Sequence, residues 1–253
     1  MSDQDAVRLQ KLIANAGKAS RREAERWIEA GRVSLNGKMA KLGDKATLND
    51  RVAIDGELLK TRKKTATSHR TLVLHKPVGV LCTRHDPEGR SNVFELLPRL
   101  GSGRWIQVGR LDINTSGLIL FTTDGELAHR LMHPSYEIER EYAVRVLGEP
   151  DAESINQLLQ GVELEDGMGR FLKIEKQHSA NKKSDAANHW FHVILKEGRK
   201  REVRRLWEAV GHKVNRLMRI RYANIRLHRE VKPGEYFELE GQSLNELKSK
   251  VKL

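Results

Sequence analysis

The sequence predicts an α+β protein in two unequal parts: a small N-terminal module and a larger domain whose mainly antiparallel sheet is flanked by helices. Three observations lead to this prediction. Helical periodicity and capping residues characterise the chain before Leu59, and a basic, aperiodic stretch that resembles a linker follows from Lys60 to Arg70. Beyond it, short β-type runs and isolated helices alternate without the regular spacing of βαβ units, which favours antiparallel strands.

The N-terminal module is expected to contain two helices and a hairpin. Ser20 and Glu23 form an S-x-x-E capping box that begins the second helix. The Asn36-Gly37 pair predicts a tight hairpin, because both residues tolerate positive φ. Apolar residues recur at helical spacing before two glycines that can end the helices: Leu9, Leu12, Ile13 and Ala16 before Gly17, and Ala24, Trp27 and Ile28 before Gly31.

The larger domain is expected to begin near residue 70 and to end near 241. Its helices are predicted after Thr123, which forms a second capping box with Glu126, and after Lys200. A polar surface loop is expected from Gln177 to Asn188. The predicted domains are residues 6–64 and 70–241, followed by a basic tail at 242–253. Six β-type runs are the expected strands: 71–75, 78–83, 118–121, 142–147, 171–174 and 190–195.

The charge of the chain indicates a polyanionic partner. Lysine and arginine number 46 against 34 acidic residues, which gives a net charge of +12. Nucleic acid is the commonest such partner, because each neutralised phosphate releases condensed counterions. Arginine suits this contact through its bidentate fork, although a solvated helix face is the alternative. The candidate RNA contacts of the N-terminal module are Arg8, Lys11, Ser20, Arg21, Arg22 and Arg32.

Several classes of chemistry lack their sequence signatures. The single cysteine, Cys82, allows neither a disulfide within the chain nor a cysteine-based zinc site. A P-loop, a dinucleotide fingerprint, an HExxH motif and a G-x-S-x-G elbow are all missing, so no cofactor and no metal are expected. The chain starts with an acidic, polar stretch and contains no apolar run of about 18 residues. We therefore expect a cytoplasmic protein without a membrane span, and a monomer by default.

Asp112 is the first candidate for a catalytic group. It lies between Gly109 and Gly117, directly before the apolar run 118–121, which is typical of a buried strand. This pattern places a carboxylate on a tight loop at the edge of the core. Aspartate also caps turns through its own backbone, and from this segment alone the two interpretations stay open.

The segment from Glu197 to Trp207 is the second informative stretch. Val203, Leu206 and Trp207 give its helix an apolar face. Arg201 and Arg205 lie roughly opposite that face, available to solvent or phosphate. Arg204 falls at the border of the buried stripe, where it either pairs with a carboxylate such as Asp112 or extends its head into water.

These segments resemble the motifs of the pseudouridine synthases. Residues 109–118, Gly-Arg-Leu-Asp-Ile-Asn-Thr-Ser-Gly-Leu, resemble the signature G-R-L-D-x-x-T-x-G-L, and residues 75–79 resemble the K-P-x-G motif that precedes it. Glu141-Tyr142 is similar to the tyrosine motif, residues 198–205 to the arginine-bearing motif and residues 217–220 to the closing stretch. The module before Leu59 resembles an S4 RNA-binding domain. The combination resembles the RsuA/RluB branch and covers the chain from about residue 6 to about 240.

The resemblance implies a cofactor-independent isomerisation of uridine to pseudouridine in ribosomal RNA. Asp112 would be the nucleophile, adding to C1′ or deprotonating the sugar through a glycal. Tyr142 would stack on a uracil that is turned out of the RNA. Arg204 would pair with Asp112 and keep it ionised, and Arg110 would enter the space left by the base. Thr115 and Leu217 complete the implied substrate-binding set.

The implied partner is large-subunit (23S) ribosomal RNA or a pre-ribosomal particle. Arg201 and Arg205 would contact its phosphates together with the N-terminal module. Alternatives are a small-subunit enzyme and a non-catalytic assembly factor that keeps the scaffold. A metal-dependent nuclease would need clustered carboxylates, for which Asp112, Asp124 and Glu126 are the candidates.

Overall fold

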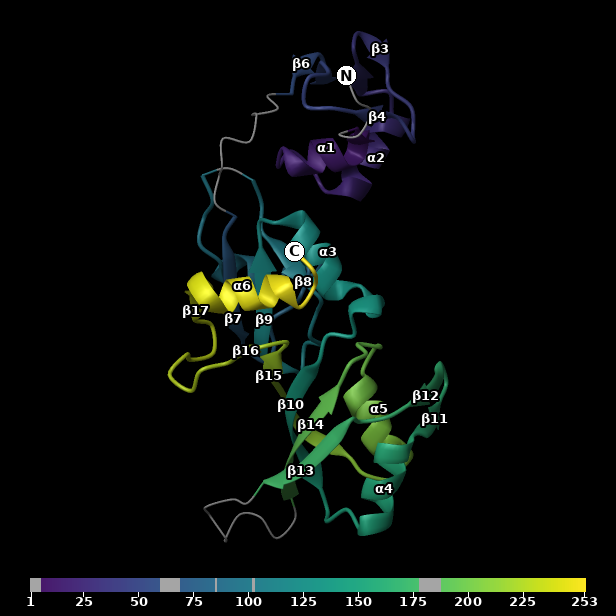
Figure 1. Cartoon of the computed structure of the whole chain (residues 1–253), viewed down its shortest axis with the longest axis vertical. Helices are drawn as coiled ribbons and strands as arrows, with labels where there is room; N and C mark the ends of the chain where they lie inside the picture. Colours follow the sequence, from purple (N-terminus) through teal and green to yellow (C-terminus); the bar gives the residue numbers. More distant parts are fainter. Residues whose placement is uncertain (1–5, 60–68, 85, 102, 178–187) are drawn as a thin grey trace. The chain divides into compact units, whose positions relative to one another are not determined.

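The structure is a computed structural model that describes residues 6–59, 69–84, 86–101, 103–177 and 188–253 (Figure 1). It forms two compact units, one of Met1–His69 with Arg99–Trp105 and one of Arg70–Pro98 with Ile106–Leu253. The segment Arg99–Trp105 belongs to the first unit, although the sequence predicts it within the second domain. The predicted linker lies largely outside the described residues, as do positions 178–187 of the predicted surface loop.

The first unit contains the predicted helices and hairpin. Glu23 N donates to Ser20 Oγ over 3.0 Å, which confirms Ser20 as the N-cap of the second helix. Asn36 and Gly37 take φ values of +51° and +82°, as the hairpin requires. The core packs both helices on the strands through residues such as Leu9, Ile13 and Ala24. The elements are α1 (Leu9–Asn15), α2 (Arg21–Glu29), a β1 (Val7–Arg8)–β4 (Lys45–Ala46) pair and a sheet of order β3 (Lys38–Met39), β2 (Val33–Leu35), β5 (Val52–Ile54), β6 (Glu57–Leu58).

The second unit is built on one sheet of order β13-β14-β10-β15-β9-β7-β17, with β16 beside β15 and β8 beside β9. Among the described residues, all pairings of this sheet are antiparallel except that of β15 with β9. The α+β prediction with a mainly antiparallel sheet is thus confirmed. The strands are β7 (Thr71–Lys76), β8 (Ile106–Val108), β9 (Ser116–Thr122), β10 (Arg140–Leu147), β13 (Lys173–Gln177), β14 (Asn188–Leu195), β15 (Val214–Tyr222), β16 (Ile225–Arg226) and β17 (Tyr236–Glu238).

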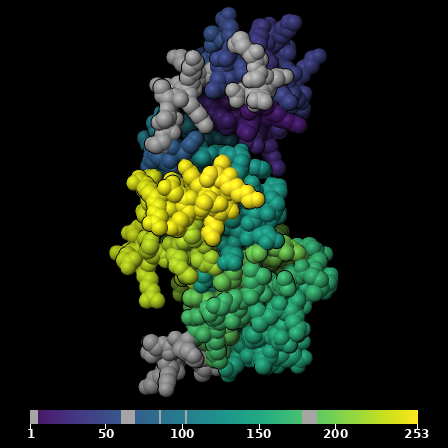
Figure 2. All heavy atoms as spheres, viewed as in Figure 1, coloured from purple at the N-terminus to yellow at the C-terminus, as the bar shows by residue number. Residues whose placement is uncertain are grey.

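Helices and a hairpin flank this sheet. They are α3 (Gly125–Met132), α4 (Ala152–Gln160), α5 (Glu202–Ala209), α6 (Gly241–Ser249), the 3-10 helices Val93–Leu96 and Pro134–Tyr136, and the hairpin β11 (Val162–Leu164)–β12 (Gly167–Gly169). The sequence predicts a tail at 242–253, but Leu247 and Val251 lie in the core of the second unit. This segment is therefore part of the domain, and Figure 2 shows it in yellow on the domain's surface.

Three local predictions are wrong. Residues 78–83 form no strand, because Gly79 adopts φ +87° and its amide turns toward Ile113. Helix α3 is capped by Asp124 instead of Thr123: its carboxylate accepts hydrogen bonds from the backbone amides of Glu126 and Leu127. The strand predicted at 171–174 begins only at Lys173, because Phe171 packs its buried ring 6.1 Å from that of Trp207.

Candidate active site

The loop between β8 and β9 carries Asp112, and three hydrogen bonds hold its backbone. The carbonyl of Ile113 accepts a hydrogen bond from Gly79 N at 2.8 Å. The next carbonyl, that of Asn114, accepts from Arg204 Nη2 at 3.1 Å, and that of Thr115 from Lys76 Nζ at 2.8 Å. Three successive carbonyls are thus held by two segments, residues 76–79 and α5, which fixes the backbone beside Asp112.

The Asp112 carboxylate differs from the other loop aspartates. Asp124 and Asp151 use their carboxylates to cap α3 and α4. The turn after Asp112 is instead closed by backbone atoms, with Thr115 N donating to Asp112 O over 3.0 Å. Asp112 is half-buried, and within the described part of the chain no hydrogen bond or ion pair engages its carboxylate. The Asp112 backbone therefore closes the turn, while its carboxylate takes no part in capping and is available to a substrate.

Arg204 supports the loop through its backbone. The side chain is buried, at 8% exposure, and Nη1 donates to Val214 O over 2.7 Å while Nη2 donates to Asn114 O. Burial lowers the pKa of Arg204, and the charge of Asp112 acts in the opposite direction. No ion pair joins these two residues in the described structure, so the expected direct pair is replaced by a bond to the carbonyl two residues after Asp112. The alternative of a solvent-directed head is also wrong.

Arg204→Met is expected to lower turnover about 100-fold while RNA affinity stays near that of the wild type. The change removes the bond to Asn114 O, and displacement of a reacting group by about 1 Å can cost that factor. Single-turnover kinetics and a filter-binding assay on the same RNA measure the two effects. A collapse of binding would instead identify Arg204 as a phosphate contact, and Arg204→Lys, which keeps the charge, is the matched comparison.

Lys76 was not among the site residues expected from the sequence. It ends the buried strand β7 with no exposed surface, and its ammonium donates to Thr115 O at 2.8 Å and Pro77 O at 2.9 Å. Burial lowers its pKa, opposed by the charges of Cys82 and Asp112. A lysine that directly follows an apolar strand could have signalled this buried cation, since its charge needs partners inside the protein.

The contribution of Lys76 to stability is expected to depend on pH. The folded-state pKa of Lys76 lies below the ordinary lysine value of 10.5, so between the two values the unfolded chain binds more protons than the folded chain. The free energy of unfolding then rises with pH. Denaturant titrations of the wild type and Lys76→Met should show their difference moving in favour of the wild type as pH approaches 10.5. A difference independent of pH would contradict the buried, cationic assignment.

The sheet register brings Tyr142 into the neighbourhood of the loop. Tyr142 on β10 pairs with Arg219 on β15, and Arg219 pairs with Gly117 on β9, directly after the loop. Tyr142 and Leu217 are both buried, at 8% and 5% exposure. Strands that lie far apart in the sequence thus bring the predicted substrate-binding residues to one region of the sheet.

Two further residues of this region escaped the site prediction. Arg219 is buried and its Nε donates to Leu118 O over 2.8 Å. Cys82 Sγ accepts a hydrogen bond from Leu111 N at 3.4 Å, and burial raises the pKa of its thiol. Both hold the segment around Asp112 in place.

Of the remaining predicted residues, Arg110 is exposed, and Thr115 is buried with no hydrogen-bond partner for Oγ1 in the described structure.

The arginines predicted to contact RNA from α5 already have carboxylate neighbours within the protein. Arg205 forms a bidentate pair with Asp166, at 2.7 and 2.9 Å, which ties α5 to the β11–β12 hairpin. Arg201 is the N-cap residue before α5, with φ +53°, and its Nη2 lies 3.6 Å from Glu208 Oε1. Arg205 is therefore a structural contact in this state of the protein, whereas Arg201 remains a candidate for RNA.

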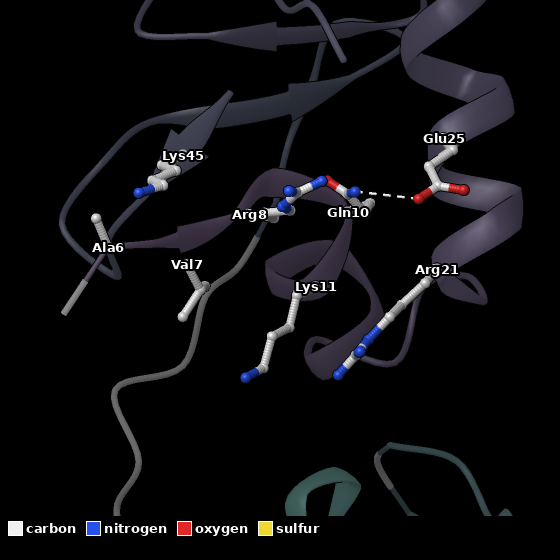
Figure 3. A pocket seen from close by; sticks show the side chains of 8 residues that line it. All are labelled: Ala6, Val7, Arg8, Gln10, Lys11, Arg21, Glu25 and Lys45. Carbon is white, nitrogen blue, oxygen red and sulfur yellow. Dashed lines mark hydrogen bonds between the residues drawn. The ribbon is translucent and has the colours of Figure 1, made fainter. Parts of the chain in front are cut away.

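The predicted RNA contacts of the N-terminal module fall into two groups, those that line a basic pocket and those that lie elsewhere. Arg8, Lys11 and Arg21 line one pocket with Lys45, around the hydrogen bond from Gln10 to Glu25 (Figure 3). Ser20 instead uses its hydroxyl to cap α2. Arg32 pairs with Asp55 and lies 5.1 Å from the Trp27 ring centre, and Arg22 is exposed. The basic pocket is the part of this unit best suited to phosphate.

Comparison with known proteins identifies the family. A model described as "RNA pseudouridylate synthase" matches residues 70–209, more than half of the chain. The chain belongs to the RNA pseudouridylate synthase family. An S4 domain model matches residues 7–52 of the synthase, so the domain type predicted for the N-terminal module is confirmed. Within the described residues, no helix of the synthase is long and apolar enough to cross a membrane.

Relatives share most of the length of the synthase. "Ribosomal large subunit pseudouridine synthase B" of Yersinia pestis is 52% identical over 97% of this chain and 76% of that protein. The protein of the same name from Escherichia coli K12 is also 52% identical, over 97% of this chain and 84% of its own. A crystal structure of a pseudouridylate synthase shares the fold, with a TM-score of 0.64 and 24% identity over 95% of this chain and 99% of that one.

Proposed function

We propose that the synthase converts one or more uridines of large-subunit (23S) ribosomal RNA to pseudouridine, with Asp112 as nucleophile. The observation that supports this most strongly is the unengaged Asp112 carboxylate on a loop whose carbonyls are held by Gly79, Arg204 and Lys76. A fixed backbone with an available carboxylate is what attack on a positioned sugar requires. The relatives named above are large-subunit enzymes by name, which favours that RNA.

The reaction needs a single nucleophile and proton transfers. Asp112 adds to C1′, and the C1′–N1 bond breaks with its electron pair going to N1 of the departing uracil. Alternatively, Asp112 removes the C2′ proton as the same bond breaks, which leaves a glycal. The uracil rotates and C5 bonds to C1′, either displacing the Asp112 carboxylate or adding to the glycal double bond while C2′ regains its proton from Asp112. Loss of the C5 proton and protonation of N1 then complete the isomer. Tyr142 stacks on the flipped uracil and assists removal of the C5 proton.

The other residues of the site hold substrate and loop. Arg204 acts as a positioning residue through Asn114 O, and Thr115 and Leu217 border the base. Arg110, exposed beside the loop, enters the stack that the uracil leaves. The S4 pocket with Arg8, Lys11 and Arg21, together with Arg22 and Arg201, binds phosphates and sets the register on the RNA. The substrate is free rRNA or a cytoplasmic pre-ribosomal particle, bound by one copy of the protein.

Mapping of pseudouridine in rRNA from a deletion strain tests this proposal. Loss of one large-subunit modification, restored by the wild type and not by Asp112→Asn, is the expected result. Loss of a small-subunit modification instead would show that large-subunit RNA is not the substrate. An unchanged modification map would favour a non-catalytic assembly factor.

A further inference from the structure

Helices cover one face of the strands β13, β14, β10 and β15, and within the described residues no helix covers the other face. Phe191 of β14 points to the covered face, since its ring centre lies 5.2 Å from that of Trp207 on α5. Figure 1 shows α4 and α5 together on this side of the strands. Neighbouring residues of a strand point to opposite faces, so Trp190 belongs to the other face, which we call the open face.

Two arginines lie directly opposite each other on the open face. The register pairs Arg145 of β10 with Arg216 of β15 on one side and with Trp190 of β14 on the other. The three side chains therefore form one row across three adjacent strands. Arg216 is exposed, whereas Arg145 and Trp190 are half-buried. Paired Cα atoms in antiparallel strands are about 5 Å apart, so the two guanidinium groups can reach the same ligand.

This row contains no acidic partner. In the described part of the chain neither arginine takes part in an ion pair or hydrogen bond, and Arg145 Nε is buried without a partner. Other charges of the same face are satisfied. Glu141 accepts from Arg221 Nε at 2.7 Å and lies 3.4 Å from His192. Like charges opposite each other in a sheet destabilise it, and an anion between the two arginines would remove that cost.

We propose that the open face binds an RNA strand, with one phosphate held between Arg145 and Arg216 and a base stacked on Trp190. Guanidinium groups match phosphate oxygens in bidentate geometry, and stacking on an aromatic ring next to a basic contact is how proteins hold single strands. A phosphate alone would not need the ring, and an acidic peptide would not use it for stacking. This inference rests on the proposed function only in taking RNA as the substrate. The RNA contact with Arg145, Arg216 and Trp190 lies on the sheet face opposite to the one that α5 covers.

Binding of the full-length protein to a fluorescein-labelled oligouridylate tests the arginine pair. Arg145→Gln/Arg216→Gln should weaken binding about 10-fold at low salt, the loss of a charge-assisted contact. It should also reduce the slope of log affinity against log salt by about 0.7, the value for one phosphate of a single strand. The control Arg229→Gln/Lys250→Gln removes two exposed cations of the same domain. Equal losses in both double variants, or no loss in the first, would overturn the proposal; the latter is also the result expected if the face binds an acidic protein.

Tryptophan fluorescence tests the stacked base. Oligouridylate should quench the emission of the wild type more than that of Trp190→Phe, which retains the other three tryptophans. The same quenching in both proteins would contradict stacking on Trp190. If the change at the half-buried Arg145 impairs folding, the single variant Arg216→Gln, at an exposed position, replaces the double variant in the binding measurement.

Separate measurements distinguish a failure of the proposed Asp112 chemistry from a failure of RNA binding on the open face. Asp112→Asn should keep the quenching and the salt slope, whereas the arginine double variant should keep wild-type turnover at saturating RNA. Loss of turnover in that variant at saturating RNA would place the arginines in the catalytic machinery and overturn the assignment to a separate face.

Discussion

Asp112→Asn is expected to reduce pseudouridine formation by about 10⁴-fold or more, because removal of a covalent nucleophile leaves only binding and orientation to act. Tritium release from RNA containing [5-³H]uridine measures the reaction directly. Affinity for the RNA should change little, since asparagine has nearly the same shape and the loop is held by Gly79, Arg204 and Lys76 through its backbone.

The matched control for this variant is Asp151→Asn. Asp151 caps α4 by accepting a hydrogen bond from Ser154 N at 2.8 Å, and asparagine serves equally well as an N-cap. It should retain wild-type activity. Tritium release by Asp112→Asn at a rate near that of this control would refute the nucleophile assignment while leaving family membership unaffected.

Gly117→Ala is expected to lower the free energy of unfolding by about 3 kcal/mol or more, or to prevent folding. Gly117 has φ +107°, and an added Cβ would lie 2.2 Å from Arg219 O and 2.6 Å from Arg219 N. These are backbone atoms of the neighbouring strand, so neither can rotate away. The pairing of β9 with β15 would have to open where it brings the Asp112 loop next to Arg219 and Tyr142.

Gly148→Ala is the control that distinguishes the overlap of the added Cβ with the Arg219 backbone from the strain of a positive φ alone. Gly148 also has positive φ, at +78°, but its added Cβ would meet no atom closer than 3.9 Å. It should therefore cost only the strain of a left-handed residue, about 1 kcal/mol. Denaturant unfolding of both variants gives the comparison. Equal losses would show that the approach of Arg219 to Gly117 is not what requires glycine.

Local chemistry explains what could be predicted from the sequence. The capping of α2 by Ser20 and the turn at Asn36-Gly37 depend on residues within a few positions of one another, so their patterns suffice. The same is true of the strand after Asp112, whose apolar run needs no partner to be recognised. Family membership also followed from the sequence, because the motif around Asp112 is contiguous.

The site depended on contacts between distant segments. Lys76 and Arg204 reach the same loop from β7 and α5, and nothing in either local pattern shows that both bond to its carbonyls. Arg205 appeared available for phosphate, yet Asp166, on a hairpin far away in sequence, engages it. Local pattern places a side chain on a face of its own helix, whereas its partner is chosen by the packing of another element.

The sequence by itself determined the family, the S4 module, the mainly antiparallel α+β class and the position of Asp112, because these are encoded in contiguous motifs and short-range periodicity. Only the tertiary structure decided how Asp112 is held, that Gly117 must be glycine, and that Arg145 and Arg216 meet on the open face. The physical reason is the same in each case. Sheet register and the burial of charge bring together groups that are dozens of residues apart, and no local pattern records which strand will lie beside which.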